Sequence, residues 1–309
     1  MKGKTKIIVI LGQTATGKSD FAVEIAKNIG GEVISADSRQ VYTGMDIGTG
    51  KITKKEMQGV SHHLLDVASP TTIFSVSKFK KMADKKIIEI SKNGHIPIIC
   101  GGTGFYIDAL IDNVILPSVK PDKKLRTELE KKSTDELYSI LKELDENRAE
   151  NIDKKNPVRL IRAIEIAKVL GSVPSISKNP ESKYDVLKIG LALPDEILKE
   201  RINKRLHARI KSGMIKEVQN LYDQNISWRK LENFGLEYRY CAQFLQGKFG
   251  DTKKKESKEK MIELLNTEIW HYAKRQKTWF KRDKDTIWIN PLETHERARA
   301  LKKVKDFIK

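Results

Sequence analysis

Near its start the chain reads Gly12-Gln13-Thr14-Ala15-Thr16-Gly17-Lys18-Ser19, which fits the phosphate-binding P-loop pattern G-x-x-x-x-G-K-[ST]. The apolar residues 7–11 before it predict a buried strand, and the residues after it predict an amphipathic helix that ends at Gly30. Such a loop turns backbone N–H groups and the helix N-terminus toward an anion. We expect Lys18 to reach the terminal phosphates of a bound polyphosphate and Ser19 to hold Mg²⁺. The alternative is a glycine-rich turn without a ligand.

The chain is strongly basic. Its 309 residues include 59 Lys and Arg against 41 Asp and Glu, which gives a formal net charge of +18. An enzyme that acts on small molecules does not need this excess, so we expect a polyanionic partner, with nucleic acid as the favoured class. A Lys-rich solvated surface without such a partner is the alternative.

The cysteines and the apolar segments bear on the compartment. Cys100 and Cys241 are far apart and neither belongs to a CxxC pair, so neither a zinc ribbon nor a disulfide framework is predicted. No apolar run approaches the roughly 20 residues that cross a membrane. The basic residues before the first strand lead into the P-loop, which argues against a signal peptide. We expect a cytoplasmic protein in a reducing compartment.

Polar residues follow two further predicted strands. The strand over residues 32–36 ends in Asp37, and the strand over residues 95–100 runs into Gly101-Gly102-Thr103. Because the carboxyl ends of parallel strands line the ligand crevice, Asp37 and Thr103 are expected beside the P-loop. Asp37 either holds Mg²⁺ through water, accepts a proton, or caps a helix. No acidic residue ends the later strand, where a nucleotide hydrolase usually has one, which weakens the ATPase interpretation.

The order of predicted elements indicates an α/β fold: a P-loop NTPase-like parallel sheet flanked by helices, with a helical insertion domain. Residues 1–114 are expected to form the first part of the core, residues 115–186 the insertion, and residues 187–309 the second part of the core. A strand over residues 187–193 opens that second part. In the insertion Arg159 and Arg162 share a helix face, and they either grip phosphates or pair with carboxylates such as Glu165.

Two basic stretches lie in the second part of the core. Arg201, Arg205 and Arg209 recur every four residues along the helix that begins near Asp195. They form a solvated stripe, or one of them points into the crevice to neutralise phosphate charge. Residues 270–283 interleave basic and aromatic side chains, a pattern that suits a nucleic-acid backbone with stacked bases. A plain basic surface helix is the alternative.

Six segments, in this order and spacing, resemble the tRNA dimethylallyltransferases of the bacterial type: GQTATGKS, DSRQVYTGMDIGT, SHHLLD, GGTGFYIDAL, NPVRLIRAIEI and HYAKRQKTWF. The resemblance runs from about Ile7 to Arg282. It implies transfer of a dimethylallyl group from dimethylallyl diphosphate to N6 of the adenosine 3′ of the anticodon. Pyrophosphate leaves and Mg²⁺ assists. Gln13 stands where the family commonly has Pro.

The resemblance also implies roles for individual residues. Asp37 is expected to be the general base, Thr103 to stand beside the target adenosine, and Lys18 and Arg205 to neutralise the leaving group, with Ser19 near the metal. The residues expected to bind the diphosphate are Gly12, Thr14, Ala15, Thr16, Gly17, Lys18, Ser19 and Arg205. Those expected to contact tRNA are Asp37, Ser38, Arg39, Gln40, Thr103, Pro157, Val158, Arg159, Leu160, Ile161, Lys274, Arg275, Gln276, Lys277, Trp279 and Lys281.

Three functions remain open on the sequence. The prenyltransferase is favoured, and we expect it to act as a monomer on the anticodon stem-loop. A P-loop kinase or NTPase that acts on a small molecule is the first alternative. The second is a noncatalytic RNA-binding protein, against which the intact P-loop and Asp37 argue.

Overall fold

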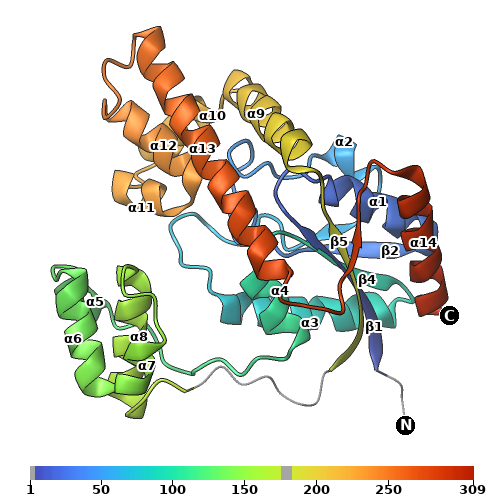
Figure 1. The fold of residues 1–309 in the computed structure, drawn as a ribbon, viewed down its shortest axis with the longest axis horizontal. Coiled ribbons are helices and arrows are strands. Elements are labelled where there is room, and N and C mark those ends of the chain that lie inside the picture. The colour runs from blue at the N-terminus through green and yellow to red at the C-terminus, as the bar shows by residue number, and fades with distance from the viewer. Residues whose placement is uncertain (1–3, 175–182) are drawn as a thin grey trace. The chain divides into compact units, whose positions relative to one another are not determined.

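The computed structural model describes residues 4–174 and 183–309, and its chain divides into two compact units (Figure 1). The larger unit contains the described residues up to Asn113 and those from Lys183 onward, and the smaller unit begins at Val114. Each unit has its own hydrophobic core.

The larger unit is built on a parallel sheet. Among the described residues this sheet has six strands in the order β3-β2-β4-β1-β5-β6. The strands are β1 (Thr5–Gly12), β2 (Gly31–Ser35), β3 (His62–His63), β4 (Ile96–Cys100), β5 (Tyr184–Leu191) and β6 (Ile287–Ile289). Strand β1 is central and pairs with β4 on one side and β5 on the other. The carboxyl ends of β1, β2 and β4 therefore lie next to one another, as the sequence predicts.

Helices cover both faces of this sheet (Figure 1). Along β1, Ile7 and Val9 face the core that contains α3 (Val76–Lys92) and α4 (Gly104–Ile111). Ile8 and Ile10 face the opposite core, with α1 (Lys18–Ile29) and α14 (Thr294–Ile308). A strand buried on both faces needs a continuous apolar run rather than an alternating one, which residues 7–11 provide.

A helical group in the same unit packs around a separate core that contains Met214, Leu231, Tyr238 and Leu265. Its helices are α9 (Asp195–Lys211), α10 (Met214–Asp223), α11 (Trp228–Asn233), α12 (Leu236–Leu245) and α13 (Lys255–Phe280), and the short α2 (Lys54–Met57) lies elsewhere in the unit. The last turn of α13 extends beyond this group, and its Phe280 packs in the core that contains α3 and α4. No helix in the described ranges is both long and apolar enough to span a bilayer.

The smaller unit is helical. It contains α5 (Lys123–Leu129), α6 (Thr134–Leu144), α7 (Glu146–Glu150) and α8 (Pro157–Leu170), packed around residues such as Leu137 and Leu160. Glu165 is 1% exposed and accepts two hydrogen bonds from Arg126, at 2.6 and 2.7 Å, and one from Arg162 at 3.2 Å. Arg162 thus pairs with a carboxylate, which is one of the two alternatives for it. A buried carboxylate of this kind needs such partners.

The predicted α/β class is confirmed, with the P-loop between β1 and α1 and with a helical insertion. The strand predicted over residues 187–193 begins earlier, at Tyr184, and ends at Leu191. The reason is pairing: Tyr184 lies opposite Thr5, and Leu191 opposite Gly12. The length of β1 therefore sets the length of β5, which apolar character alone does not reveal.

Candidate functional site

A large pocket lies where the carboxyl ends of β1, β2 and β4 meet. Its volume is about 1060 Å³, and it is formed entirely within the larger unit. The P-loop, the segment after β2 and the glycine loop after β4 all contribute to its wall. The expected site residues that line it are Thr14, Ala15, Gly17, Lys18, Ser19, Asp37, Ser38, Arg39, Gln40, Thr103, Arg205, Arg275 and Gln276.

The P-loop backbone needs its glycines. Gly12 has φ of 140°, and a Cβ there would lie 2.4 Å from the carbonyl oxygen of Leu191. Gly17 caps α1 with φ of 89°, in the left-handed region that favours glycine. The buried Thr16 hydroxyl donates to the carbonyl of Gln13 at 2.8 Å, which holds the turn closed. The loop is thus fixed from inside, and its outer edge lines the pocket.

Two cations in the pocket have neutral hydrogen-bond partners. Lys18 Nζ donates to the carbonyl of Gln13 at 2.6 Å, and Arg205 donates to the hydroxyl of Thr14. Within the described ranges neither forms an ion pair. Burial lowers the pKa of Lys18 to about 8, and burial together with the neighbouring Arg209 lowers the pKa of Arg205. Two partly desolvated positive charges that form no ion pair among the described residues make a site that an anion would stabilise.

Asp37 and Thr103 join the ends of β2 and β4. Asp37 Oδ1 accepts the backbone N–H groups of Arg39, at 2.8 Å, and Gln40, at 3.3 Å. Thr103 Oγ1 accepts the N–H of Ser38 at 3.1 Å. Asp37 therefore caps the turn that follows it, and it also lines the pocket, so capping does not exclude a role toward a ligand there.

Helix α13 is tied to the P-loop by two glutamines. Gln276 Oε1 accepts the N–H of Thr14 at 2.8 Å, and its Nε2 donates to the carbonyl of Gly102 at 2.8 Å. In return Gln13 Nε2 donates to the carbonyl of Ala273 at 3.1 Å. Gln276 was expected to contact tRNA, but it is 6% exposed and its amide bridges the two glycine loops. The residue in place of the family's Pro thus makes a buried hydrogen bond.

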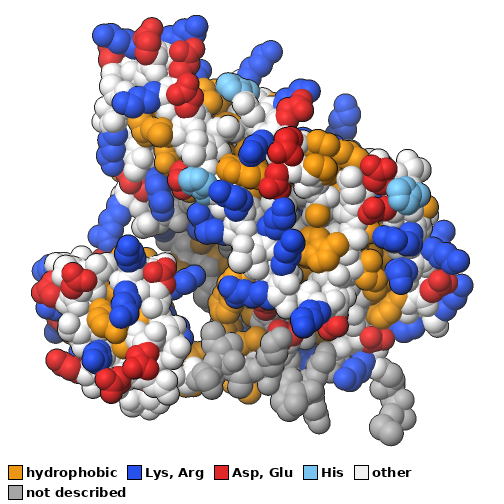
Figure 2. Space-filling view, in the orientation of Figure 1, with side chains coloured by type: hydrophobic (Ala, Val, Ile, Leu, Met, Phe, Trp, Pro, Cys, Tyr) orange, Lys and Arg blue, Asp and Glu red, His pale blue; other side chains and the backbone are white. Residues whose placement is uncertain are grey.

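The other residues expected to contact tRNA differ in accessibility. Lys274 and Arg275 are exposed on α13, and Lys281 is exposed at the C-cap of that helix. Figure 2 shows Lys and Arg side chains gathered where Figure 1 places the second half of α13. Lys277 forms an ion pair with Asp195 at 2.9 Å. The indole of Trp279 donates to Asp108 at 2.9 Å, and a Cβ on Gly104 would lie 2.3 Å from its ring. In contrast to the exposed cations, Trp279 is packed into the protein.

In the smaller unit the residues expected to contact tRNA also include both exposed and buried side chains. Pro157, Val158 and Arg159 are exposed in the first turn of α8. Leu160 and Ile161 lie in the core, at 0% and 8% exposure. Their side chains serve packing, because the apolar stripe of α8 must face the other helices of its unit.

The arginines of α9 contribute more to the pocket than the sequence indicates. Arg201, Arg205 and Arg209 all line it, whereas the sequence left open a solvated stripe or one inward arginine. Arg209 donates to the carbonyl of Gly48 at 3.3 Å and pairs with Glu237 at 3.4 Å. The four-residue spacing is the signal in the sequence, since it places all three on one face of the helix.

Comparisons with known proteins find relatives over nearly the whole chain. The family model described as IPP transferase matches residues 40–283. A tRNA dimethylallyltransferase of Pediococcus pentosaceus is 40% identical, over 98% of this chain and 97% of that protein. The crystal structure of a tRNA isopentenylpyrophosphate transferase from Bacillus halodurans is 36% identical, with a TM-score of 0.71, and covers 99% of this chain and 96% of that one. A eukaryotic dimethylallyltransferase, whose structures describe it acting on tRNA, is 26% identical with a TM-score of 0.77, over 98% of this chain and 79% of that one. This chain therefore belongs to the IPP transferase family.

Proposed function

We propose that the protein transfers a dimethylallyl group from dimethylallyl diphosphate to N6 of the adenosine 3′ of the anticodon in tRNA and releases pyrophosphate. The observation that carries the proposal is the pair of desolvated cations, Lys18 and Arg205, in one pocket with Asp37 and Thr103. The cations suit a diphosphate, and the carboxylate suits an acceptor that must lose a proton.

The diphosphate half of the pocket favours departure of the leaving group. An allylic diphosphate ionises readily when the charge that develops on the departing oxygens is neutralised. Lys18 and Arg205 would supply positive charge, and the N–H groups at the start of α1 would supply dipoles. Because both cations lose solvation in the pocket, their attraction to the anion is stronger than it would be in water.

The acceptor half addresses the weak nucleophile. The lone pair of an exocyclic adenine amine is delocalised into the ring, so attack needs a base that accepts the N6 proton. Asp37 would fill this role, and the turn that follows it would hold the carboxylate in position through Oδ1. Thr103 would stand beside the base, with its hydroxyl held by the N–H of Ser38.

The oxygen donors of the pocket fit Mg²⁺. Ser19 and Asp37 line the same pocket, and Mg²⁺ is commonly held by one or two protein oxygens together with substrate phosphates and water. The described residues contain no group of three or more His, Cys, Asp and Glu side chains placed to hold a metal. Ser19 would therefore share the ion with the diphosphate. When bound, Mg²⁺ would supply further neutralisation of the leaving group.

Several features support tRNA as the acceptor. The exposed cations of α13 suit a phosphate backbone, and the net charge of +18 favours a polyanion. Extrusion of one adenosine from a single-stranded loop costs only a few kcal/mol.

We further propose that residues 115–186 act as an insertion domain that contacts the anticodon stem, and that the protein is a monomer of the cytoplasm. Size-exclusion chromatography with light scattering tests the oligomeric state.

The test is a transfer assay with radiolabelled dimethylallyl diphosphate, Mg²⁺ and unmodified tRNA. We expect label in the tRNA, and none in a matched tRNA that carries guanosine in place of the target adenosine. ATP turnover without label in tRNA would instead support the small-molecule kinase or NTPase. A nucleotide hydrolase usually has an acidic residue at the end of such a strand. Here β4 ends at Cys100, and the chain continues with Gly101, which argues against that alternative.

A further inference from the structure

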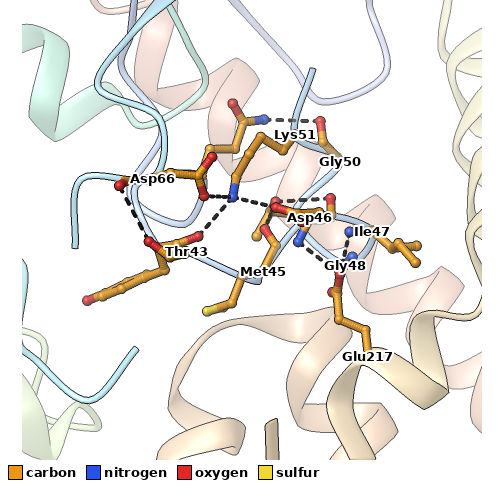
Figure 3. A network of polar contacts seen from close by, with 12 residues as sticks. Thr43, Met45, Asp46, Ile47, Gly48, Gly50, Lys51, Asp66 and Glu217 are labelled. Carbon is orange, nitrogen blue, oxygen red and sulfur yellow. Dashed lines mark hydrogen bonds and ion pairs between the residues drawn. The ribbon is translucent and has the colours of Figure 1, made fainter. Parts of the chain in front are cut away.

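The carboxylate of Glu217 on α10 organises a loop that lines the pocket (Figure 3). Its Oε2 accepts the N–H groups of Asp46, at 2.9 Å, and Ile47, at 2.7 Å, and its Oε1 accepts the N–H of Gly48 at 3.0 Å. The hydroxyl of Tyr238 also donates to Oε1, at 2.6 Å. Four donors thus converge on one side chain that lies 169–171 residues away from the loop in sequence.

The other end of the loop is held by Lys51. Its Nζ contacts the Asp46 carboxylate at 2.6 Å, the Asp66 carboxylate at 2.5 Å and the carbonyl of Tyr42 at 2.8 Å (Figure 3). The side chain of Lys51 is only 6% exposed. Residues 46–51, which we call the anchored loop, are therefore fixed at both ends by charge-assisted hydrogen bonds, the strong class of such bonds.

The anchored loop lies between Glu217 and the large pocket that Asp37 and Thr103 line. Residues 46–51 line the large pocket, while Glu217 lines a smaller one of about 370 Å³, and Ile47 lines both. Two carbonyls of the loop reach the site: that of Gly48 accepts from Arg209, and that of Gly50 accepts from Gln40 Nε2 at 3.2 Å. The N–H of Gln40 in turn donates to Asp37 Oδ1.

The loop also lacks room for adjustment. A Cβ on Gly48 would lie 2.7 Å from the Tyr238 ring, and one on Gly50 would lie 1.6 Å from the Arg209 guanidinium. Gly50 has φ of 60°, which other residues adopt at a cost. The position of this backbone is therefore set by its anchors and its neighbours together.

We propose that Glu217 is a positioning residue for the transfer reaction: through the anchored loop it fixes the Arg209 guanidinium and, on the acceptor side of the pocket, the Gln40–Asp37 contact. This inference rests on the proposed function. The diphosphate side has its own supports: Lys18, Arg205 and Gln276 form hydrogen bonds with the P-loop, and in the described part of the chain none of them bonds to the anchored loop. Loss of the Glu217 carboxylate should therefore affect turnover more than diphosphate binding.

Glu217→Gln is the sharpest variant, because it keeps the size of the side chain. Each oxygen of Glu217 accepts two hydrogen bonds. The amide NH₂ of Gln would face either the two N–H groups of Asp46 and Ile47 or the N–H of Gly48 and the Tyr238 hydroxyl. In both orientations it cannot accept from the backbone N–H that it faces. Tyr238→Phe removes one donor and leaves the three backbone contacts in place. The matched control is Glu232→Gln: Glu232 accepts from Gln243, Gln246 and Lys248, and does not line the pocket.

Three measurements are made on each variant: kcat for label transfer with both substrates saturating, the Kd of inorganic pyrophosphate, and hydrogen exchange of residues 46–48. For Glu217→Gln we expect kcat to fall about 10- to 100-fold, since misplacement of a site by about 1 Å has such effects. Exchange at residues 46–48 should accelerate, and the pyrophosphate Kd should change less than about threefold. Tyr238→Phe and Glu232→Gln should keep kcat within about threefold of the original protein.

The outcomes separate this inference from the proposed function. If the unchanged protein labels tRNA and Glu217→Gln labels it equally fast, the inference is overturned and the function stands. An equal loss of kcat in Glu232→Gln would also overturn it, because general destabilisation would then explain both variants. If the unchanged protein labels no tRNA, the proposed function fails. In that case the positioning role is refuted on its own if hydrogen exchange at residues 46–48 is as slow in Glu217→Gln as in the original protein.

Discussion

Replacement of the buried Gln276 by alanine tests whether this residue serves the P-loop or the tRNA. Its amide contacts the N–H of Thr14 and the carbonyl of Gly102, each at 2.8 Å, and the hydroxyl of Tyr272 at 3.3 Å. Alanine would leave the first two groups without this partner, at a cost of about 1–3 kcal/mol each. Because the adjacent pocket admits water, we expect the lower part of that range. The free energy of unfolding should fall by about 2–3 kcal/mol.

The same substitution should weaken diphosphate binding. The P-loop would lose one of its two links to α13, and the link from Gln13 to Ala273 would remain. We expect the Kd of inorganic pyrophosphate to rise about three- to tenfold, which corresponds to about 0.7–1.4 kcal/mol. The Kd for tRNA should change by less than about twofold, because the side chain is 6% exposed and its amide faces the P-loop.

The assays are urea unfolding, calorimetric titration with pyrophosphate, and filter binding of tRNA. Gln219→Ala is the control, since Gln219 makes a surface contact to Asp223 and should change the free energy of unfolding by less than about 0.5 kcal/mol. If Gln276→Ala left the stability unchanged and weakened tRNA binding instead, the reasoning from burial would be refuted and the tRNA contact supported.

Three further predictions concern the charges of the site. Asp37→Asn keeps an oxygen that can accept the N–H groups of the turn but removes the base. We therefore expect kcat to fall on the order of 10²–10⁴-fold while tRNA still binds. Lost tRNA binding with unchanged kcat would contradict this expectation. Lys277→Ala should weaken tRNA binding and reduce the slope of log K against log salt by at most about 0.7–0.9, because the ion pair with Asp195 already offsets part of the charge; an unchanged slope would argue against a phosphate contact. Because burial lowers the pKa of Lys18 to about 8, its charge is present below that pH and is lost above it. Pyrophosphate affinity should therefore fall about tenfold more between pH 7 and pH 9 in the original protein than in Lys18→Arg, and parallel pH profiles would contradict this assignment.

Much of the site could be predicted because its parts are local. The P-loop is contiguous, and Asp37 and Thr103 directly follow predicted strands. Parallel pairing of β1, β2 and β4 brings their carboxyl ends together whatever the loops do, so these residues line one pocket as expected. The predicted family is confirmed, since six separate segments at fixed spacing are far more specific than one motif.

Other predictions rested on sequence patterns alone, and these did not identify which side chains pack against the rest of the protein. The interleaved basic and aromatic residues of 270–283 suggested a surface for nucleic acid, but that pattern did not reveal that Trp279 packs against Asp108 and Gly104. The pattern of α8 likewise did not separate the exposed Val158 from the buried Leu160 as potential tRNA contacts. A helical period identifies faces, while the partner of each face depends on how the helices dock.

The amino-acid sequence by itself determined the class of fold, the phosphate loop and the residues at the strand ends, because these follow from short segments whose geometry neighbouring residues dictate. Only the tertiary structure decided which distant side chains complete the site. Arg205 reaches Thr14 across 191 residues, Gln276 reaches the same residue across 262, and Glu217 holds the anchored loop across about 170. Such contacts arise when helices distant in sequence pack against the loops at the end of the sheet, and a hydrogen bond a few ångströms long depends on that packing rather than on any local pattern.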